Sequence, residues 1–150
     1  MRRTVQSPLG PLTLVAEAGA LTELRWGRAG REDESNLLAR AAGALAAYFA
    51  GERLDFDLPV APGGTAHDHA VWRAMQRIPA GETRTYGEVA RDIRSGPRAV
   101  GTACGRNPIP IIVPCHRIVA AGGALGGYSG QGGLETKRFL LELESSLRLR

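Results

Sequence analysis

The chain has 150 residues, 43% hydrophobic, 23% charged and 5% aromatic, with a formal net charge of +4 at pH 7, a composition that excludes wholesale disorder. No apolar run approaches the roughly 20 residues that cross a bilayer, and no apolar segment follows the charged first residues, so we expect neither a membrane span nor a secretory signal, and a cytoplasmic location. Residues 1–75 carry a net charge of −1 and residues 76–150 a net charge of +5, which reflects either an ordinary solvated surface or an anionic partner such as nucleic acid.

The first third of the chain predicts a β-meander followed by a helix. Residues 4–6, 12–16 and 21–26 are short runs rich in apolar and β-branched residues, separated by turn segments with Pro and Gly. Ser35 fits a helix N-cap, and apolar residues then recur at helical spacing until Gly51.

The middle of the chain predicts one more strand and then a change of domain. Residues 55–60 have a strand-like composition. Residues 61–64, Ala-Pro-Gly-Gly, fit a linker. We therefore expect two domains, residues 1–62 and 63–150.

Three helices are predicted at the start of the second domain. Thr65 fits the N-cap of the first, and Thr85 with Glu88 three residues later matches a capping box that opens the second. Ser-Gly-Pro at residues 95–97 ends that helix, and a third, residues 98–104, consists almost entirely of small residues. Two short helices joined by a tight turn are typical of a helix-turn-helix. Small side chains would allow close approach to a duplex groove or to another helix.

The remaining segments predict an extended stretch, a loop and a helix. Residues 109–114 are apolar but contain prolines, which indicates an extended buried segment. Seven of the 15 residues from 120 to 134 are glycine, which fits either a backbone that approaches a ligand closely or a flexible loop. Residues 134–147 have the leucine spacing of an amphipathic helix.

The most unusual local pattern is the run Pro114-Cys115-His116-Arg117. A cysteine is nucleophilic as the thiolate, and a nearby imidazole and positive charge lower its pKa. The alternative is a small buried hydrophobic residue. The other cysteine is Cys104, and we expect both thiols to stay reduced. Two cysteines and three histidines leave too few ligands for structural zinc, so we expect no metal.

Six segments carry a resemblance to a known family. In chain order they are residues 78–83 (IPAGET), 85–90 (TYGEVA), 98–103 (RAVGTA), 107–119 (NPIPIIVPCHRIV), 127–130 (GYSG) and 140–144 (LLELE). Together they resemble the O6-alkylguanine-DNA alkyltransferases, also called methylated-DNA–protein-cysteine methyltransferases. Residues 1–62 resemble the variable N-terminal domain of that family more loosely. The start of the first helix, His67-Asp68-His69, departs from the family pattern.

The resemblance implies an α/β (α+β) fold with two domains. The N-terminal domain would be a small β-meander with a helix, similar to ribonuclease H. It would pack on a mostly helical C-terminal domain of winged helix-turn-helix type.

The resemblance also implies an activity. Such proteins move the alkyl group from O6-alkylguanine, and often from O4-alkylthymine, in double-stranded DNA onto their own cysteine. The base is flipped out through the minor groove, and the protein is consumed in a single turnover. The resemblance implies a monomer without a cofactor, metal or membrane partner, and leaves cooperative binding on DNA open.

Each site residue is implied by its place in the matching motifs. Cys115 would attack the alkyl carbon, and His116, oriented by Glu144, would take the thiol proton through a water. Asn107 would hold the turn and form a hydrogen bond near the thiol. The substrate would be bound by Tyr86, Val119, Tyr128 and Ser129. The DNA would be contacted by Thr85, Arg98, Ala99, Gly101 and Arg106.

Two other classes of function remain open at this point. A protein that only senses the lesion would flip the base and recruit other factors, but it would have no use for an activated thiol. A cysteine hydrolase would turn over without being consumed, but it would not need a basic helix-turn-helix.

Overall fold

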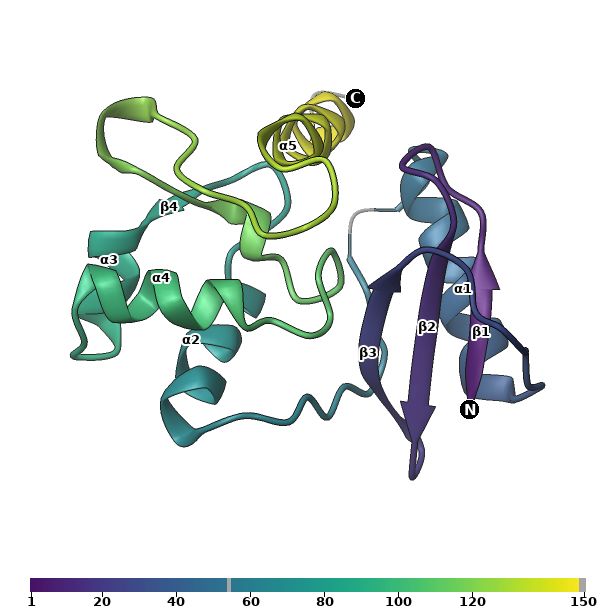
Figure 1. Ribbon diagram of the computed structural model, residues 1–150. Coiled ribbons are helices and arrows are strands. Elements are labelled where there is room, and N and C mark those ends of the chain that lie inside the picture. The colour runs from purple at the N-terminus through teal and green to yellow at the C-terminus, as the bar shows by residue number, and fades with distance from the viewer. Residues whose placement is uncertain (54, 149–150) are drawn as a thin grey trace. The chain divides into compact units, whose positions relative to one another are not determined.

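The computed structural model describes residues 1–53 and 55–148, the last two by their backbone alone. The chain forms two compact units, Met1–Gly63 and Gly64–Arg150. The first contains a small sheet and one long helix, and the second is mostly helical (Figure 1). The mixed α and β fold class is confirmed. Among the described residues, no helix combines the length and the apolar character that a membrane crossing requires.

The first unit is built on a three-stranded antiparallel sheet. Its strands are β1 (Arg2–Val5), β2 (Leu12–Glu17) and β3 (Ala20–Trp26), in the order β1-β2-β3. The predicted meander is therefore confirmed. Leu12 and Leu14 of the middle strand are fully buried. They are two residues apart and so point to the same face of the strand, which makes that face part of the core of the unit.

One helix, α1 (Asn36–Phe49), packs against β1 and β2, as Figure 1 shows. Ser35 is its N-cap, because the hydroxyl oxygen accepts a hydrogen bond from the backbone N–H of Leu38 at 3.0 Å. Tyr48 on its inner face is fully buried. The helix ends at Phe49, and Gly51 follows its C-cap with a φ of 80°, which a glycine adopts without strain.

The strand predicted over residues 55–60 is wrong. Val60 forms an isolated parallel bridge with Leu21 instead. The backbone N–H of Leu21 donates to Pro59 O at 2.9 Å, and the N–H of Ala61 donates to Leu21 O at 2.8 Å. Because a proline has no N–H, Pro59 interrupts the ladder that a strand would need.

The second unit contains the predicted helix-turn-helix. The unit begins with three helices, α2 (Ala66–Gln76), α3 (Tyr86–Asp92) and α4 (Pro97–Gly105). The helix-turn-helix is formed by α3 and α4. Thr65 is the N-cap of α2 and Thr85 completes the capping box of α3, both as predicted. The capping box that Thr65 forms with Asp68 was not predicted. Helix α4 packs against both α2 and α3.

A short parallel strand pair in this unit was not predicted. Strand β4 (Arg84–Thr85) pairs with β5 (Ile118–Val119). Two-residue strands are too short to show periodicity in a sequence. The pairing connects the start of α3 to the segment that follows Cys115, and it thereby sets the distance between these two parts of the site.

Residues 109–114 are buried as predicted, but they turn instead of being extended. Ile111 has a φ of 75°, and the backbone N–H of Val113 donates to Ile109 O at 2.9 Å. The prolines pointed to extended backbone, whereas the side chain of Asn107 fixes a turn. Its amide group donates to Val113 O at 2.7 Å, and its oxygen accepts from Ile109 N at 2.9 Å, which is a common way for asparagine to stabilise a turn.

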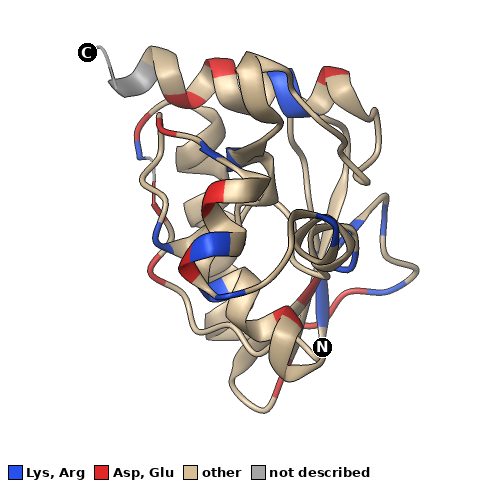
Figure 2. Ribbon diagram, turned by 90° about the vertical axis from the view of Figure 1, so that its left-hand side faces the viewer, with Lys and Arg blue, Asp and Glu red and all other residues tan. Residues whose placement is uncertain are grey.

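The chain then passes through two short 3-10 helices and ends in a long helix. The short ones are η1 (Cys115–Arg117) and η2 (Ala121–Gly123), and the long one is α5 (Leu134–Arg148). The predicted C-terminal helix is therefore confirmed, with Leu140 fully buried. Figure 2 shows both acidic and basic positions, coloured red and blue, along the ribbon of α5. Two of these residues, Lys137 and Glu144, are buried and belong to the site described below.

The N-cap of α1 gives a direct test of the fold of the first unit. Ser35→Ala removes the side-chain acceptor for the N–H of Leu38, so we expect the free energy of unfolding to fall by about 1 kcal/mol. Urea unfolding followed by circular dichroism measures it. The matched variant Ser35→Asp keeps an acceptor and should stay close to the wild type. An equal loss in both variants would contradict the capping role.

Candidate active site

A cavity of about 310 Å³ opens on the second unit. Helices α3 and α4, the η1 turn and the glycine-rich loop contribute its walls. The lining residues are Tyr86, Gly101, Cys104, Gly105, Cys115, Gly127, Tyr128 and Ser129. The volume is at the small end of ligand-binding cavities, which suits a flat compound such as a single base.

Cys115 lies at the first residue of η1, directly after the buried turn, and is 7% exposed. Burial raises the pKa of its thiol, while a hydrogen bond with Asn107 and the positive charge of Lys137 act in the opposite direction. Asn107 therefore contacts both the turn and the thiol. A thiol held this way needs a proton acceptor close by to react as the thiolate.

His116, the next residue in the chain, forms a pair with Glu144, and both are fully buried. His116 Nε2 lies 2.7 Å from Glu144 Oε2. Burial lowers the pKa of His116 despite the carboxylate, so the imidazole is neutral near pH 7. With Nε2–H donating to Glu144, Nδ1 is the free acceptor. Within the described part of the chain, Nδ1 has no hydrogen-bond partner.

Arg117 completes this cluster. The sequence placed it in the Pro114–Arg117 run as a positive charge near the thiol, but its pairing with Glu144 was not predicted. Its Nε donates to Glu144 Oε1 at 2.9 Å and its Nη2 donates to Glu144 Oε2 at 3.0 Å. Its Nη1 donates to Ile78 O at 2.7 Å. Burial opposes ionisation of Glu144, but the hydrogen bonds from His116 and Arg117 outweigh it and lower the pKa of Glu144 to about 2.

Lys137 is a second functional residue that the sequence reasoning missed. Its side chain is fully buried, and Nζ donates to Ile118 O at 2.6 Å and to Gly127 O at 3.0 Å. Nζ also lies 5.9 Å from the centre of the Tyr86 ring. The ammonium group thus links α5 to β5 and to the glycine-rich loop that forms part of the cavity wall. Its position three residues before the buried Leu140 was the available signal, because that spacing places both on one helix face.

Three of the four residues predicted to bind the substrate lie together at the cavity. Tyr86, Tyr128 and Ser129 line the cavity, whereas Val119 is not among the lining residues. Burial raises the pKa of both tyrosines. Gly126 allows the loop to come close, since a Cβ there would lie 2.9 Å from the Tyr86 ring, and its φ is 75°.

Cys104 shares the cavity with Cys115 but has a different environment. Burial raises the pKa of Cys104 to about 12. The hydrogen bond from Asn107 acts on the Cys115 thiol. Of the two thiols in the cavity, Cys115 is therefore the one equipped to react.

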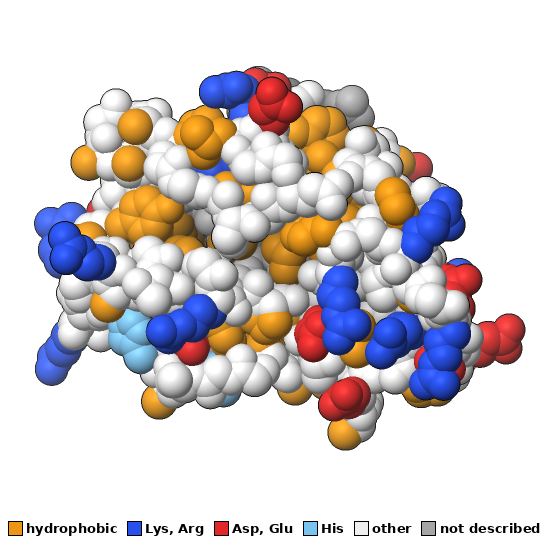
Figure 3. Space-filling model, in the orientation of Figure 1, with side chains coloured by type: hydrophobic (Ala, Val, Ile, Leu, Met, Phe, Trp, Pro, Cys, Tyr) orange, Lys and Arg blue, Asp and Glu red, His pale blue; other side chains and the backbone are white. Residues whose placement is uncertain are grey.

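The predicted DNA-contacting residues lie along α3 and α4. Arg98 and Ala99 are exposed in the first turn of α4, and Gly101 lines the cavity. Figure 3 shows Lys and Arg side chains on the face of the molecule in view, beside pale blue histidines. The hydroxyl of Thr85 is occupied as the N-cap of α3, because it accepts from Glu88 N at 3.1 Å.

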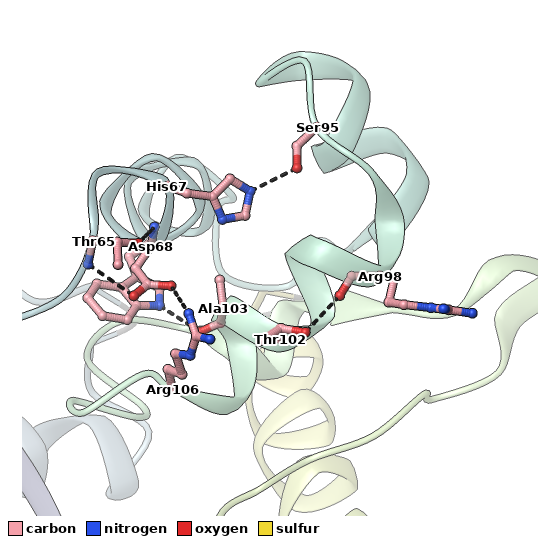
Figure 4. Close-up of polar contacts among 9 residues, drawn as sticks. Thr65, His67, Asp68, Ser95, Arg98, Thr102, Ala103 and Arg106 are labelled. Atoms are coloured by element: carbon pink, nitrogen blue, oxygen red, sulfur yellow. Dashed lines mark hydrogen bonds and ion pairs between the residues drawn. The ribbon is translucent and has the colours of Figure 1, made fainter.

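Figure 4 shows Arg98 and Arg106 near opposite ends of α4. Arg98 points away from the polar contacts of α2. Arg106 contacts Asp68, with 3.3 Å between Arg106 Nη1 and Asp68 Oδ1. Arg106 therefore belongs to a second cluster, distinct from the one around Cys115.

The helix-turn-helix places the chain among DNA-binding proteins, and the buried thiol at the cavity places it among those with a cysteine nucleophile. Two family models agree. Residues 66–146 match the 6-O-methylguanine DNA methyltransferase, DNA binding domain. Residues 1–62 match the 6-O-methylguanine DNA methyltransferase, ribonuclease-like domain. The chain belongs to this family of DNA-repair methyltransferases, whose acceptor is a cysteine of the protein.

Individual relatives show the same likeness over nearly the whole chain. The methylated-DNA–protein-cysteine methyltransferase of Mycobacterium bovis is 46% identical over 96% of this chain and 92% of its own length. That of Methanosarcina acetivorans is 44% identical over 94% of this chain and 96% of its own. The crystal structure of Mycobacterium tuberculosis OGT in complex with DNA is 47% identical, covers 97% of this chain and 93% of its own, and has a TM-score of 0.87.

The Glu144 cluster predicts a specific dependence of stability on pH. The pKa of Glu144 falls from 4.5 to about 2 on folding, so its contribution is fully present above pH 4.5 and is lost as the pH falls toward 2. Glu144→Gln should remove this part of the acid dependence. It should also lower the free energy of unfolding at pH 7 by about 3–5 kcal/mol, because Arg117 stays buried without its carboxylate.

Urea unfolding at a series of pH values measures both effects. Glu142→Gln, on the exposed side of the same helix, makes the same change of charge and serves as the control. The assignment fails if the two variants show the same stability and the same pH profile.

Proposed function

We propose that this protein repairs O6-alkylguanine in double-stranded DNA by transferring the alkyl group to Cys115, irreversibly and once per molecule. The observation that carries the proposal is the position of Cys115 on a compact cavity, followed in the chain by a neutral His116 that is hydrogen-bonded to Glu144. DNA is bound by the relative from Mycobacterium tuberculosis, and membership of the same family supports DNA as the partner here.

The transfer is an in-line displacement at the alkyl carbon. A bond forms between Cys115 Sγ and that carbon while the bond from the carbon to guanine O6 breaks, and its electron pair stays with the base. The thiol proton passes to His116 Nδ1, the free acceptor of the neutral imidazole. Glu144 holds the ring and stabilises its protonated form, and Asn107 holds the thiol. The product is a thioether, which explains a single turnover.

The leaving guanine gains negative charge as the bond to O6 breaks. Tyr86 and Ser129 line the cavity, and their hydroxyl groups are the donors proposed to stabilise this charge. Tyr128 forms part of the pocket for the base, and Val119 supports it from β5. An alkylated thymine is smaller than guanine and fits the same pocket, so we extend the proposal to O4-alkylthymine.

The target base must leave the duplex to reach a buried thiol, at a cost of a few kcal/mol. We propose that it does so through the minor groove, with α4 inserted there. Ala99 and Gly101 keep the helix narrow enough for a groove about 6 Å wide. Arg98, exposed at the start of α4, fills the space left by the base. Thr85 and Arg106 contact the DNA on either side of these residues.

The two domains differ in their proposed roles. Residues 63–150 bind DNA and carry out the transfer, while residues 1–62 have a structural role. The protein needs no cofactor in this scheme, because the thiol itself is the acceptor. We propose that it acts as a monomer in the cytoplasm.

The first test concerns the acceptor. After incubation with a duplex that contains O6-methylguanine, mass spectrometry should find a methyl group in place of one hydrogen on the peptide that carries Cys115, and not on that of Cys104. Cys115→Ser should abolish transfer and keep duplex affinity within about twofold, because the thiol lies in the cavity and not on α4. Repair of several lesions per protein molecule would overturn the proposal.

The second test concerns base flipping. Arg98→Ala should slow transfer from duplex by at least about tenfold, because the duplex closes again when the space is left empty. Transfer from the free base O6-methylguanine needs no flipping and should keep its rate. Single-turnover kinetics on the two substrates measures the ratio. An equal effect on both substrates would refute this role of Arg98.

A further inference from the structure

Asp68 is a buried carboxylate that the proposed transfer does not use. It lies in the first turn of α2 and is 2% exposed. Its Oδ2 accepts the backbone N–H of Thr65 at 3.1 Å, and its Oδ1 accepts from Arg106 Nη1 at 3.3 Å (Figure 4). The hydrogen bonds from Thr65 and the charge of Arg106 overcome the effect of burial and lower the pKa of Asp68. Asp68 is therefore ionised where it meets Arg106.

Arg106 differs from its partner in exposure. Its side chain is 58% exposed, whereas that of Asp68 is 3% exposed. A guanidinium group has five N–H donors, and the contact with Asp68 uses one of them. The carboxylate therefore fixes one edge of the group and leaves the other donors accessible to an acceptor from outside.

The backbone that carries Arg106 is also fastened to α2. Trp72 Nε1 donates to Ala103 O at 2.9 Å in a buried hydrogen bond. At the other end of α4, His67 Nε2 lies 2.8 Å from the hydroxyl of Ser95, as Figure 4 shows. Helix α2 thus contacts the C-terminal turn of α4 through Trp72 and the segment just before α4 through His67. These contacts fix the backbone from which the Arg106 side chain extends.

The spacing of Arg98 and Arg106 suits a helix that lies in a groove. The two residues are about 12 Å apart along α4 at 1.5 Å per residue. Arg98 lies at the end proposed to enter the minor groove, and Arg106 lies at the end where the helix leaves it. A side chain at that second end meets the phosphates that border a groove about 6 Å wide.

We propose that Asp68 is a positioning residue that orients Arg106 toward a phosphate of the bound duplex. The inference rests on the proposed function, since it requires a DNA duplex as the partner. An arginine that is already oriented loses less conformational freedom on binding. Its planar fork also matches the geometry of a phosphate.

The direction of the effect separates this role from a simple charge effect. Asp68 is negative, so its removal near a polyanion would tighten binding if charge alone mattered. Loss of the oriented Arg106 would weaken binding. The variant Asp68→Asn distinguishes the charge effect from the loss of Arg106 orientation, because they change the affinity in opposite directions. It also keeps an oxygen that can accept the backbone N–H of Thr65 at the N-terminus of α2.

The experiment is a double-mutant cycle on affinity for an unmodified DNA duplex, measured by fluorescence anisotropy over a range of salt concentrations. Asp68→Asn should weaken binding about two- to tenfold. Arg106→Gln should weaken binding and reduce the slope of log affinity against log salt by about one. The double variant should bind like Arg106→Gln alone. Glu23→Gln, which removes an acid paired with Arg25 in the first unit, is the control for the same change of charge.

Three results would overturn the inference: unchanged or tighter binding by Asp68→Asn, a further loss from Asp68→Asn in the Arg106→Gln background, or an unchanged salt slope for Arg106→Gln. The salt slope of Arg106→Gln tests the inference even if Asp68→Asn fails to fold. Methyl transfer from the free base by each variant shows that the cavity is intact. A wild-type protein that transfers from the free base but binds no duplex would refute the proposed function itself.

Discussion

The carboxylate of Glu144 is the point on which the geometry of the second unit depends. It accepts hydrogen bonds from His116 and Arg117 in the absence of solvent, and Arg117 continues to the carbonyl of Ile78. Three segments far apart in the chain are thereby held at one place: the C-terminal helix, the turn that follows Cys115, and the end of the first helix of this unit. A buried ion pair contributes little net stability compared with apolar packing, but each partner requires the other. The hydrogen bond to Glu144 therefore fixes the position of the His116 imidazole.

A buried cysteine that serves as the acceptor of an alkyl group has conflicting requirements. Burial keeps other electrophiles away from Cys115 but also disfavours the thiolate. The hydrogen bond from Asn107 and the charge of Lys137 act against this penalty. The same residues also shape the cavity, since Asn107 fixes the buried turn and Lys137 holds the glycine-rich loop. Reactivity and shape thus depend on the same few side chains.

The sequence predicts best what local interactions determine. The N-caps at Ser35, Thr65 and Thr85 were predictable because a capping side chain and its N–H lie within three residues. The turn at Ile111 was not, because an asparagine outside the apolar run fixes it. Lys137 resembles an ordinary surface charge in the sequence, and Arg117 stands out only as a neighbour of Cys115. Contacts with distant carbonyls and with the carboxylate of Glu144 show that both are buried. For the same reason, the site residue Glu144 could be proposed from a family resemblance and not from its own surroundings in the chain.

The two thiols of the cavity differ in chemical character. Cys104 has a pKa of about 12 and remains protonated in any physiological buffer, although it lines the same space as Cys115. The two cysteines thus share one space but differ in what surrounds their sulfur atoms, since Asn107 forms a hydrogen bond with Cys115. Proximity to the same cavity therefore does not make the two sulfur atoms equivalent as nucleophiles.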